Sequence, residues 1–347
     1  MRHLLKNLVY GAAKWLGPMR LARRRTAGGL RIRCYHGFSL GDEHTWRPTT
    51  FMTADTFRQR MQYVVSHGFP VLGLEEAMAR LGRRDLPPGA VVITFDDAFY
   101  STYRLAWPVL RELQLPATVY VTTYYCLKEN PVFRLAVQYM FWKAAGDRVD
   151  LTGMPPGTAD TVSLRDAKET HRAAWAIIEW AETQCTEDER CDVARQLGGR
   201  LRVDYERLVR DRTLSLMNTG ELRELAEAGA DLQLHTHRHR MPDEESGLAR
   251  EIQDNRAVLE PLTGRPAVHF CYPSGVWSEH HQPYLATQGI ATATTCDPGL
   301  NYPDTPRLAL RRFLDGQHID LITFEAELHG LAEVLRRARA SLAGKAP

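Results

Sequence analysis

The hydrophobic positions along this chain alternate between two periods. Short runs of apolar and β-branched residues, typical of strands buried on both faces of a parallel sheet, recur between segments with helical spacing. The predicted strands are 30–38, 91–95, 117–123, 230–234, 267–272, 290–295 and 308–314. The predicted helices are 54–69, 73–82, 100–113, 218–229, 244–262, 279–288 and 319–341. This order predicts an α/β fold with a parallel sheet, open or closed into a barrel.

Residues 127–213 break the alternation. They carry helical patterns such as "VFRLAVQYMFWKAAG" and one polar segment, "TGMPPGTADTVS". We interpret them as a helical insertion that covers one side of a site at the carboxyl ends of the strands, where parallel α/β folds bind ligands. The expected organisation is a basic helix at 1–29 and a single domain at 30–347 that contains this insertion.

The N-terminal residues 1–25 combine apolar residues at helical spacing with lysine and arginine and contain no acidic residue. They lack the uninterrupted apolar run of a signal peptide or a membrane-spanning helix. Two interpretations remain. One is an amphipathic helix lying on an anionic membrane surface, and the other is a helix packed on its own domain with a solvated basic face.

The composition narrows the class of protein. The chain has 347 residues, of which 44% are hydrophobic and 25% are charged, and a net charge of +2 gives no reason to expect nucleic acid as a partner. The six cysteines are scattered without a CxxC motif, which favours a reducing compartment. Cys185 and Cys191 would pair only if the protein were exported. We therefore expect a cytoplasmic protein, with peripheral contact at the inner membrane through residues 1–25.

Candidate chemistry begins with two adjacent carboxylates, Asp96 and Asp97, at the end of the strand "VVITF". Neighbouring buried carboxylates repel, so such a pair needs a cation or a hydrogen-bond donor nearby. A second signal is "LQLHTHRHRMP", where His235, His237 and His239 follow another predicted strand. Because the carboxyl ends of parallel strands meet at one edge, an aspartate and two of these histidines suit a three-ligand metal site. The alternative for the histidines is a solvated polar loop.

In this interpretation a bound dication offsets the charge of Asp97, and Asp96 stays ionised as a general base. Together, the "TFDD" segment and the later "HTHRH" segment resemble the polysaccharide deacetylase family, carbohydrate esterase family 4. The resemblance covers about 30–125 and 214–315. It implies a distorted (β/α) barrel and a metal-dependent N-deacetylase of amino sugars, with zinc as the expected ion and cobalt or nickel as alternatives.

The resemblance also implies a role for each matching residue. Asp96 corresponds to the catalytic base, and Asp97, His235 and His239 correspond to the metal ligands. Two further motifs match. In "FCYPSG", Tyr272 and Ser274 correspond to the residues of the oxyanion hole and substrate contact, with the backbone of Ser274 as the donor. In "YHGF", His36 belongs to a Tyr-His pair that many exopolysaccharide-type members carry.

Three departures from the family pattern raise doubts about the site. Ala98 follows the aspartates where the family often has glycine, and Cys271 stands where an arginine often orients the base. The late Leu-x-His motif that supplies the acid is absent, and "LALRRF", with Arg311 and Arg312, takes its place. We therefore assign His36 as the proton donor, ahead of His318. The alternative is that His36 only hydrogen-bonds substrate or a loop.

The expected activity is removal of an N-acetyl or similar acyl group from an amino sugar in bacterial surface-polysaccharide or glycolipid metabolism. One alternative keeps the site and changes the substrate to a non-polymeric or lipid-linked amide. The other, favoured by the missing arginine and acid histidine, is a degenerate member that binds glycan without turnover.

Overall fold

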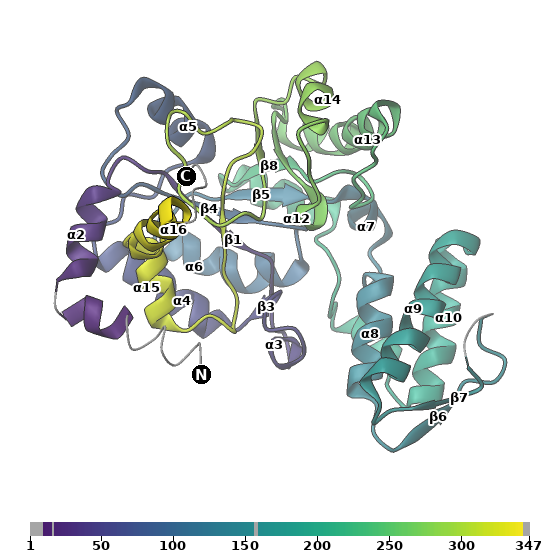
Figure 1. Cartoon of the computed structure of the whole chain (residues 1–347). Coiled ribbons are helices and arrows are strands. Elements are labelled where there is room, and N and C mark those ends of the chain that lie inside the picture. Colours follow the sequence, from purple (N-terminus) through teal and green to yellow (C-terminus); the bar gives the residue numbers. More distant parts are fainter. Residues whose placement is uncertain (1–9, 16, 156–158, 343–347) are drawn as a thin grey trace.

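The structure is a computed structural model that describes residues 10–15, 17–155 and 159–342. Its centre is a seven-stranded parallel sheet in the order β10-β9-β8-β5-β4-β1-β11 (Figure 1). The strands of this sheet are β1 (Arg31–Tyr35), β4 (Val91–Phe95), β5 (Thr118–Val121), β8 (Asp231–Leu234), β9 (His269–Cys271), β10 (Thr292–Thr294) and β11 (Phe313–Leu314). The sheet is parallel because a helix or a longer connection joins each strand to the next, as the alternating sequence predicts.

The two edges of the sheet are joined by one segment, 307–314. Its first half runs beside β10, where the Leu310 amide donates to the Ala293 carbonyl at 2.8 Å and Leu310 forms an isolated parallel bridge with Thr294. Its second half is β11, where Phe313 pairs with Arg33 of β1. The sheet therefore curls into a distorted barrel, and the predicted fold class is confirmed. The predicted strand 308–314 is wrong in extent, because the segment changes partner midway and only 313–314 forms a ladder.

Helices cover the outer face of the curled sheet. They are α4 (Ala54–Ser66), α5 (Leu74–Arg83), α6 (Trp107–Glu112), α7 (Thr123–Lys128), α12 (Thr219–Glu227), α13 (Glu245–Thr263), α14 (His281–Thr287), α15 (Leu321–Leu328) and α16 (Leu331–Leu342). The predicted helix 319–341 is two helices, because Gly330 at φ 76° ends the first of them. A capping box stabilises α12, in which the Asn218 side chain accepts from the Glu221 amide and the Glu221 carboxylate accepts from the Asn218 amide.

Between β5 and β8 the chain forms a lobe beside the barrel (Figure 1). The lobe contains α8 (Phe133–Lys143), α9 (Ala167–Gln184), α10 (Glu187–Leu201), α11 (Tyr205–Arg210) and the antiparallel hairpin of β6 (Arg148–Asp150) and β7 (Thr161–Ser163). We call 127–213 the insertion. The sequence did not predict the hairpin, whose two short strands lie on either side of the Gly/Pro-rich sequence and bury only Val149 and Val162 of their six residues.

The insertion contacts the barrel through α8. Helix α8 meets the segment that contains α3 (Glu43–Trp46), which lies between the small parallel strands β2 (Gly37–Phe38) and β3 (Phe51–Met52). The Tyr139 hydroxyl donates to the Asp42 carboxylate at 2.5 Å, and the rings of Trp46 and Tyr139 meet edge to face at 5.2 Å. Arg47 donates to the side-chain carbonyl of Gln138. These contacts fix the insertion against the loop that follows β2.

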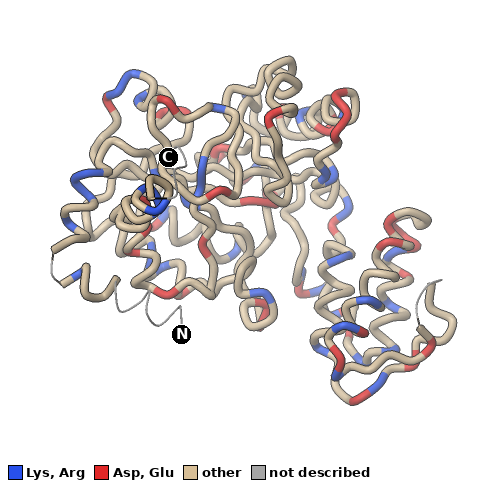
Figure 2. The backbone as a smooth tube through the Cα atoms, viewed as in Figure 1, with Lys and Arg blue, Asp and Glu red and all other residues tan. Residues whose placement is uncertain are grey.

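The described N-terminal residues pack on the C-terminal helices. Residues 10–15 are helical, and α2 (Pro18–Arg25) follows them. One face of this segment, including Tyr10 and Met19, is buried against Leu331 and Ala332 of α16. Trp15 is 87% exposed. Figure 2 shows basic residues concentrated on α2, whereas both signs of charge are mixed along the insertion. The first part of the predicted membrane-binding segment, 1–9, lies outside the described residues.

Two expectations about the covalent and membrane state of the chain can be compared with the structure. Cys185 and Cys191 are both free thiols, as are the other four cysteines. Cys34 and Cys271 lie on strands, but Cys296 does not, since it follows β10 in a bend. Within the described ranges, no helix has the length and apolar character needed to cross a bilayer.

Candidate active site

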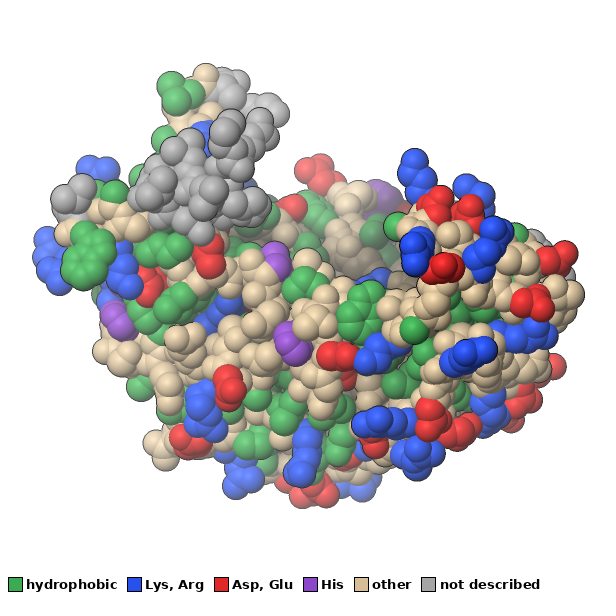
Figure 3. Space-filling model, turned by 90° about the horizontal axis from the view of Figure 1, so that it is seen from below, with side chains coloured by type: hydrophobic (Ala, Val, Ile, Leu, Met, Phe, Trp, Pro, Cys, Tyr) green, Lys and Arg blue, Asp and Glu red, His purple; other side chains and the backbone are tan. Residues whose placement is uncertain are grey.

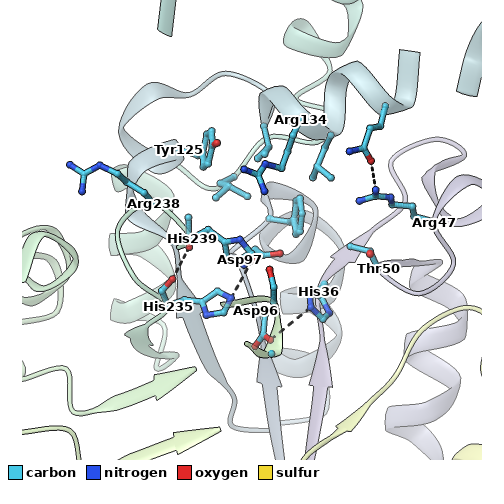
Figure 4. Close-up of a pocket in the computed structure, with 18 of the residues that line it drawn as sticks. His36, Arg47, Thr50, Asp96, Asp97, Tyr125, Arg134, His235, Arg238 and His239 are labelled. Carbon is cyan, nitrogen blue, oxygen red and sulfur yellow. Dashed lines mark hydrogen bonds and ion pairs between the residues drawn. The ribbon is translucent and has the colours of Figure 1, made fainter. Parts of the chain in front are cut away.

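A pocket of about 310 Å³ lies where the carboxyl ends of the central strands face the insertion (Figure 4). The barrel side of its lining includes polar residues that follow β1, β4, β8 and β9, and all the residues proposed from the sequence as site residues are among them: His36, Asp96, Asp97, His235, His239, Tyr272 and Ser274. The insertion side consists of Val132, Arg134, Leu135, Gln138 and Trp175. The volume is at the low end of the roughly 300–1,000 Å³ of small-molecule sites.

An unusual turn brings both aspartates to this pocket. Side chains alternate along a strand, so Asp96 and Asp97 can share a site only where the strand has ended. After Phe95 the backbone enters the left-handed region at Asp97, with φ 70°, and at Ala98, with φ 67°. This conformation is costly for any residue with a Cβ atom. It gives a physical reason for the glycine that the family often has at the position of Ala98.

Asp96 is fully buried and is held by a guanidinium. Arg312 donates from Nη1 to Asp96 Oδ1 at 2.7 Å and from Nη2 to Oδ2 at 2.8 Å, a bidentate pair in which Arg312 is fully buried. Burial raises the pKa of Asp96, but the charge and hydrogen bonds of Arg312 outweigh burial and hold it well below its usual range. The carboxylate is therefore ionised and fixed in orientation.

Asp97, His235 and His239 converge on one point. Asp97 Oδ1 lies 3.4 Å from His235 Nε2 and 3.3 Å from His239 Nε2, and the two imidazole rings meet edge to face at 4.9 Å. Ligands about 2.0–2.2 Å from a tetrahedral zinc ion would lie about 3.3–3.5 Å apart. The donor set of one carboxylate and two imidazoles, with these spacings, fits zinc or a similar divalent ion with a coordination position left open.

Hydrogen bonds orient both imidazoles. His235 Nδ1 donates to the Cys271 carbonyl at 2.8 Å, so the lone pair of the neutral ring is on Nε2, which faces Asp97. Burial lowers the pKa of His239 to about 4, which keeps that ring neutral as a ligand must be. Burial raises the pKa of Asp97, but His239 and His235 lower it to about 2. Asp97 is thus ionised and His239 neutral near neutral pH, as metal ligands must be. Burial lowers the pKa of His235, but Cys271 and Asp97 outweigh burial and hold it well above its usual range, so a bound metal ion would have to displace the proton from Nε2 of that ring.

The third histidine of the loop is directed elsewhere. Thr236, at φ 61°, and His239, at φ 54°, both adopt left-handed backbone, which turns the loop back toward Asp97. His237 lies outside the ligand group, and its Nδ1 is 2.8 Å from the Thr123 hydroxyl. The loop therefore presents its first and last imidazoles to the pocket and uses the middle one in packing.

Among the described residues three other groups could also bring metal-ligand atoms together, and each is less suitable. Two of them include Asp96, whose oxygens already pair with Arg312. The last is Asp243, His280 and His281, outside the pocket lining. There His281 Nδ1 accepts from the Ser278 amide, so the neutral ring carries its proton on Nε2, the atom that faces Asp243. The Asp97 group alone combines suitable spacing with free lone pairs.

His36 follows β1 at the edge of the pocket. Its Nε2 lies 3.8 Å from Asp96 Oδ2, and its side chain is 21% exposed (Figure 4). The hydroxyl of Thr102, in the π-helical turn Thr102–Ala106, donates to the His36 carbonyl at 2.8 Å and fixes the backbone there. The Nδ1 atom is buried and has no hydrogen-bond partner among the described residues. His36 therefore lies at the pocket with its Nε2 atom near Asp96.

Tyr272 and Ser274, which follow β9, also line the pocket. The Tyr272 hydroxyl donates to the Leu308 carbonyl at 2.9 Å, so only its ring faces the pocket. Ser274 is exposed, with φ 56°, in the one-turn segment Pro273–Gly275. Gly275 is required there, because a Cβ atom would lie 2.7 Å from Cys296 Sγ. This tight turn presents the backbone of Ser274 at the pocket.

Sequence reasoning missed the function of Arg312 and the residues of the opposite wall. The sequence identified Arg312 only as part of "LALRRF". Its guanidinium pairs with Asp96, as the family's arginine at the position of Cys271 was expected to do. The signal was an arginine inside an otherwise apolar run, since such a charge is buried only with a partner. Arg47, Thr50, Arg134 and Trp175, which also line the pocket, carried no motif, and Arg238, inside the "HTHRH" segment, was given no function.

Comparison with known proteins is consistent with this geometry. The family model described as polysaccharide deacetylase matches residues 153–293, a range that includes His235, His239 and Ser274 and begins after Asp97. No curated protein sequence matches the chain.

Solved structures share the fold. The deacetylase PplD of Streptococcus pyogenes, solved with acetate, has a TM-score of 0.56 at 16% identity, covering 89% of this chain and 98% of PplD. IcaB from Ammonifex degensii has a TM-score of 0.54 at 18% identity, covering 87% and 97%. A de-N-acetylase from Aggregatibacter actinomycetemcomitans has a TM-score of 0.52 at 11% identity, covering 86% and 99%. With the motifs on this fold and the family-model match over 153–293, the resemblance of the chain to the polysaccharide deacetylase family that was seen in the sequence is confirmed.

Proposed function

We propose that this protein is a metal-dependent hydrolase that removes an N-acetyl group from an amino sugar. The observation that carries the proposal is the convergence of Asp97, His235 and His239 on one point, beside a second buried carboxylate. The family supports deacetylation of a polysaccharide as the general activity. Metal dependence and the bacterial surface polysaccharide as substrate are our finer proposals.

Asp97, His235 and His239 would hold the ion. When bound, a zinc, cobalt or nickel ion would supply Lewis acidity, which polarises the amide carbonyl and makes water acidic near neutral pH. The surrounding residues carry out the proton transfers. Asp96 accepts a proton from the attacking water, as an ionised carboxylate within the pocket can do. Arg312 keeps that carboxylate ionised and aimed, so we assign it as a positioning residue.

His36 then donates a proton to the leaving nitrogen. Its Nε2 is near Asp96, so the base and the acid lie beside the same reacting amide. The carbon–nitrogen bond breaks, the sugar keeps the amine, and acetate leaves with the oxygen of the water. We assign the backbone amide of Ser274, a residue that lines the pocket, to stabilise the negative charge that develops on the carbonyl oxygen, and we assign Tyr272, which also lines the pocket, to substrate contact.

The glycan-binding alternative loses one of its two arguments. It depended in part on a missing arginine beside the base, and Arg312, which directly precedes β11, pairs with that base. The other argument, the missing Leu-x-His histidine, is answered only by our assignment of His36, whose Nε2 lies 3.8 Å from Asp96 Oδ2. A lipid-linked or other non-polymeric amide remains an alternative substrate of the same site.

Acetate release tests the proposal. The purified protein is stripped with a chelator, reloaded with zinc or cobalt, and incubated with N-acetylated amino-sugar oligomers. We expect acetate only from the reloaded protein. A protein that binds one ion per chain and the oligomers, yet releases no acetate, would establish the glycan-binding alternative instead.

We also propose peripheral attachment to an anionic inner membrane through the N-terminal segment. Trp15 and Leu21 are 87% and 49% exposed, and Arg20, Arg24 and Arg25 are exposed near them. Figure 3 shows hydrophobic and basic side chains side by side at the end of the molecule where α2 lies. One face of α2 packs on its own domain, and the other face, which carries these side chains, is exposed. The exposed face is therefore available to contact a membrane surface.

Vesicle binding tests the attachment. Each basic residue near an anionic bilayer contributes about 1 kcal/mol, so changing Arg20, Arg24 and Arg25 together to glutamine should weaken binding to phosphatidylserine vesicles about a hundredfold. Added salt should also weaken the binding of the unchanged protein to these vesicles, because it screens the attraction between charges. Arg111→Gln on the exposed side of α6 serves as the control. Equal binding of the triple variant would rule the attachment out.

A further inference from the structure

Three arginines line the pocket, and two of them are neutralised. Arg134 forms a bidentate pair with Glu182, at 2.9 and 2.6 Å. Arg238 Nη1 lies 3.0 Å from carboxylate oxygens of both Glu251 and Asp254. Arg47 differs from both, because no carboxylate of the described residues lies within ion-pair distance of it.

The surroundings of Arg47 fix it in place without balancing its charge. Its guanidinium lies 4.8 Å from the centre of the Trp46 ring, and Nη2 donates to the neutral side-chain carbonyl of Gln138. Nε and Nη1 donate to no described residue. The backbone is held as well, since the Arg47 amide donates to the Glu43 carbonyl at 2.8 Å. Burial lowers the pKa of Arg47, and no acidic neighbour counters this effect.

A half-buried cation without a counter-ion is unfavourable, and an anion that enters the pocket would relieve the cost. The two aspartates of the pocket do not act as the counter-ion of Arg47, because Arg312 neutralises Asp96 and Asp97 belongs to the ligand group. In Figure 4, Arg47 and Thr50 lie on the His36 side of the pocket, across from His239. One substrate molecule could therefore place its amide at the ligand group and a separate anionic group at Arg47.

We propose that Arg47 binds an anionic oxygen group, a phosphate or a carboxylate, carried by the amino sugar that is deacetylated. Guanidinium groups bind both in forked hydrogen bonds, and the free Nε and Nη1 provide the donors. The inference rests on the proposed function, because it takes the amide to be cleaved at the Asp97 group. It narrows the substrate class to charged amino sugars, such as glycosyl phosphates or sugar acids.

The test compares three probes with the zinc-loaded protein: N-acetylglucosamine, N-acetylglucosamine 1-phosphate and N-acetylmuramic acid, whose charge is a carboxylate. We expect kcat/KM to be about ten- to one-hundredfold higher for a charged probe than for the neutral one, the range of a hydrogen bond to a charged group. Which charged probe is preferred identifies the anion. Arg47→Gln should bring the ratio of charged to neutral probe close to one.

Gln138 provides a matched pair of variants that separates binding from packing. Gln138→Glu places a carboxylate against Arg47 and should lower the charged-to-neutral ratio while Arg47 is still present. Gln138→Met has a similar length but no charge and should keep the ratio. If Arg47 only fastens α8 to the barrel, Gln138→Glu would strengthen the contact and leave the ratio unchanged, which would overturn the proposal. Thermal unfolding of each variant reports whether it is folded.

The failure of this inference can be distinguished from failure of the proposed function. If the unchanged protein releases acetate from no probe, the deacetylase proposal fails, and calorimetric binding of N-acetylglucosamine 1-phosphate still tests Arg47. If acetate is released equally from all three probes, the deacetylase proposal stands and the anion site is refuted. A charged-probe preference that survives Arg47→Gln would also refute it.

Discussion

We call the pocket-lining residues that follow β1, β4, β8 and β9 the rim. The rim and the insertion form opposite walls of one pocket, but their side chains are fixed in different ways. On the rim, Asp96 and His235 are fully buried, and each is held by hydrogen bonds from other strands or their extensions. On the insertion, Arg134, Gln138 and Trp175 are only partly buried and lie on helices joined to the barrel by a few contacts. This difference suggests that the rim performs the chemistry and that the insertion selects the substrate.

The largest expected effects are on the rim, at the two aspartates. Asp97→Asn should remove the bound metal and the activity together, because two histidines alone leave the site short of a ligand. Asp96→Asn should keep the metal but lower acetate release about 10²–10⁴-fold, the usual contribution of a general base. Elemental analysis and acetate release on both variants distinguish the roles. Near-full activity of Asp96→Asn, or unchanged metal content in Asp97→Asn, would contradict these assignments.

Removing the partner of Asp96 should have the next largest effect. Arg312→Met leaves a buried carboxylate unpaired, which typically costs about 3–5 kcal/mol of folding free energy. Without Arg312, burial dominates and the pKa of Asp96 rises, so the acidic limb of the pH–rate profile should move to higher pH. Urea unfolding and a pH–rate profile measure the two consequences. Arg311→Met, at the neighbouring exposed position, is the control and should change neither.

The barrel should also show a pH-dependent stability that comes from a buried histidine. Burial lowers the pKa of His329, at the end of α15, to about 4, from about 6.5 in the unfolded chain. The unfolded state then binds more protons between these values, so stability should fall as pH drops from about 6.5 to 4, by less than about 1.4 kcal/mol per pH unit. His329→Gln should flatten this slope. A slope unchanged by the substitution would assign the dependence to other groups.

The smallest expected effect is on the insertion. Trp175 lines the pocket from α9, away from the metal-ligand group. Trp175→Ala should raise KM about two- to tenfold through lost ring contact, with kcat and metal content nearly unchanged. Steady-state kinetics and elemental analysis measure both. A large fall in kcat would mean that the insertion takes part in the chemistry, and the contrast between the two walls would no longer hold.

Much of the barrel and the core of the site could be predicted from the sequence, because short-range patterns determine them. The buried run 91–95 and the later run 230–234 each end in polar residues, and the carboxyl ends of parallel strands meet at one edge. That reasoning predicted that an aspartate and two of the histidines after 230–234 meet, and the resemblance to the family specified Asp97, His235 and His239. Capping signals at Asn218 and Glu221 likewise depend only on residues three apart.

The tertiary structure alone decided the rest, because those contacts join residues that no local pattern relates. Arg312 pairs with Asp96 across 216 positions, and its segment is a strand beside β1 but only a bridge beside β10. Arg47 meets Gln138 across 91 positions, through a contact between a short loop and a helix. The periodicity of the apolar residues determines which residues form a helix or strand and which face of it is buried. Which side chains then meet across a pocket depends on how these elements pack in three dimensions.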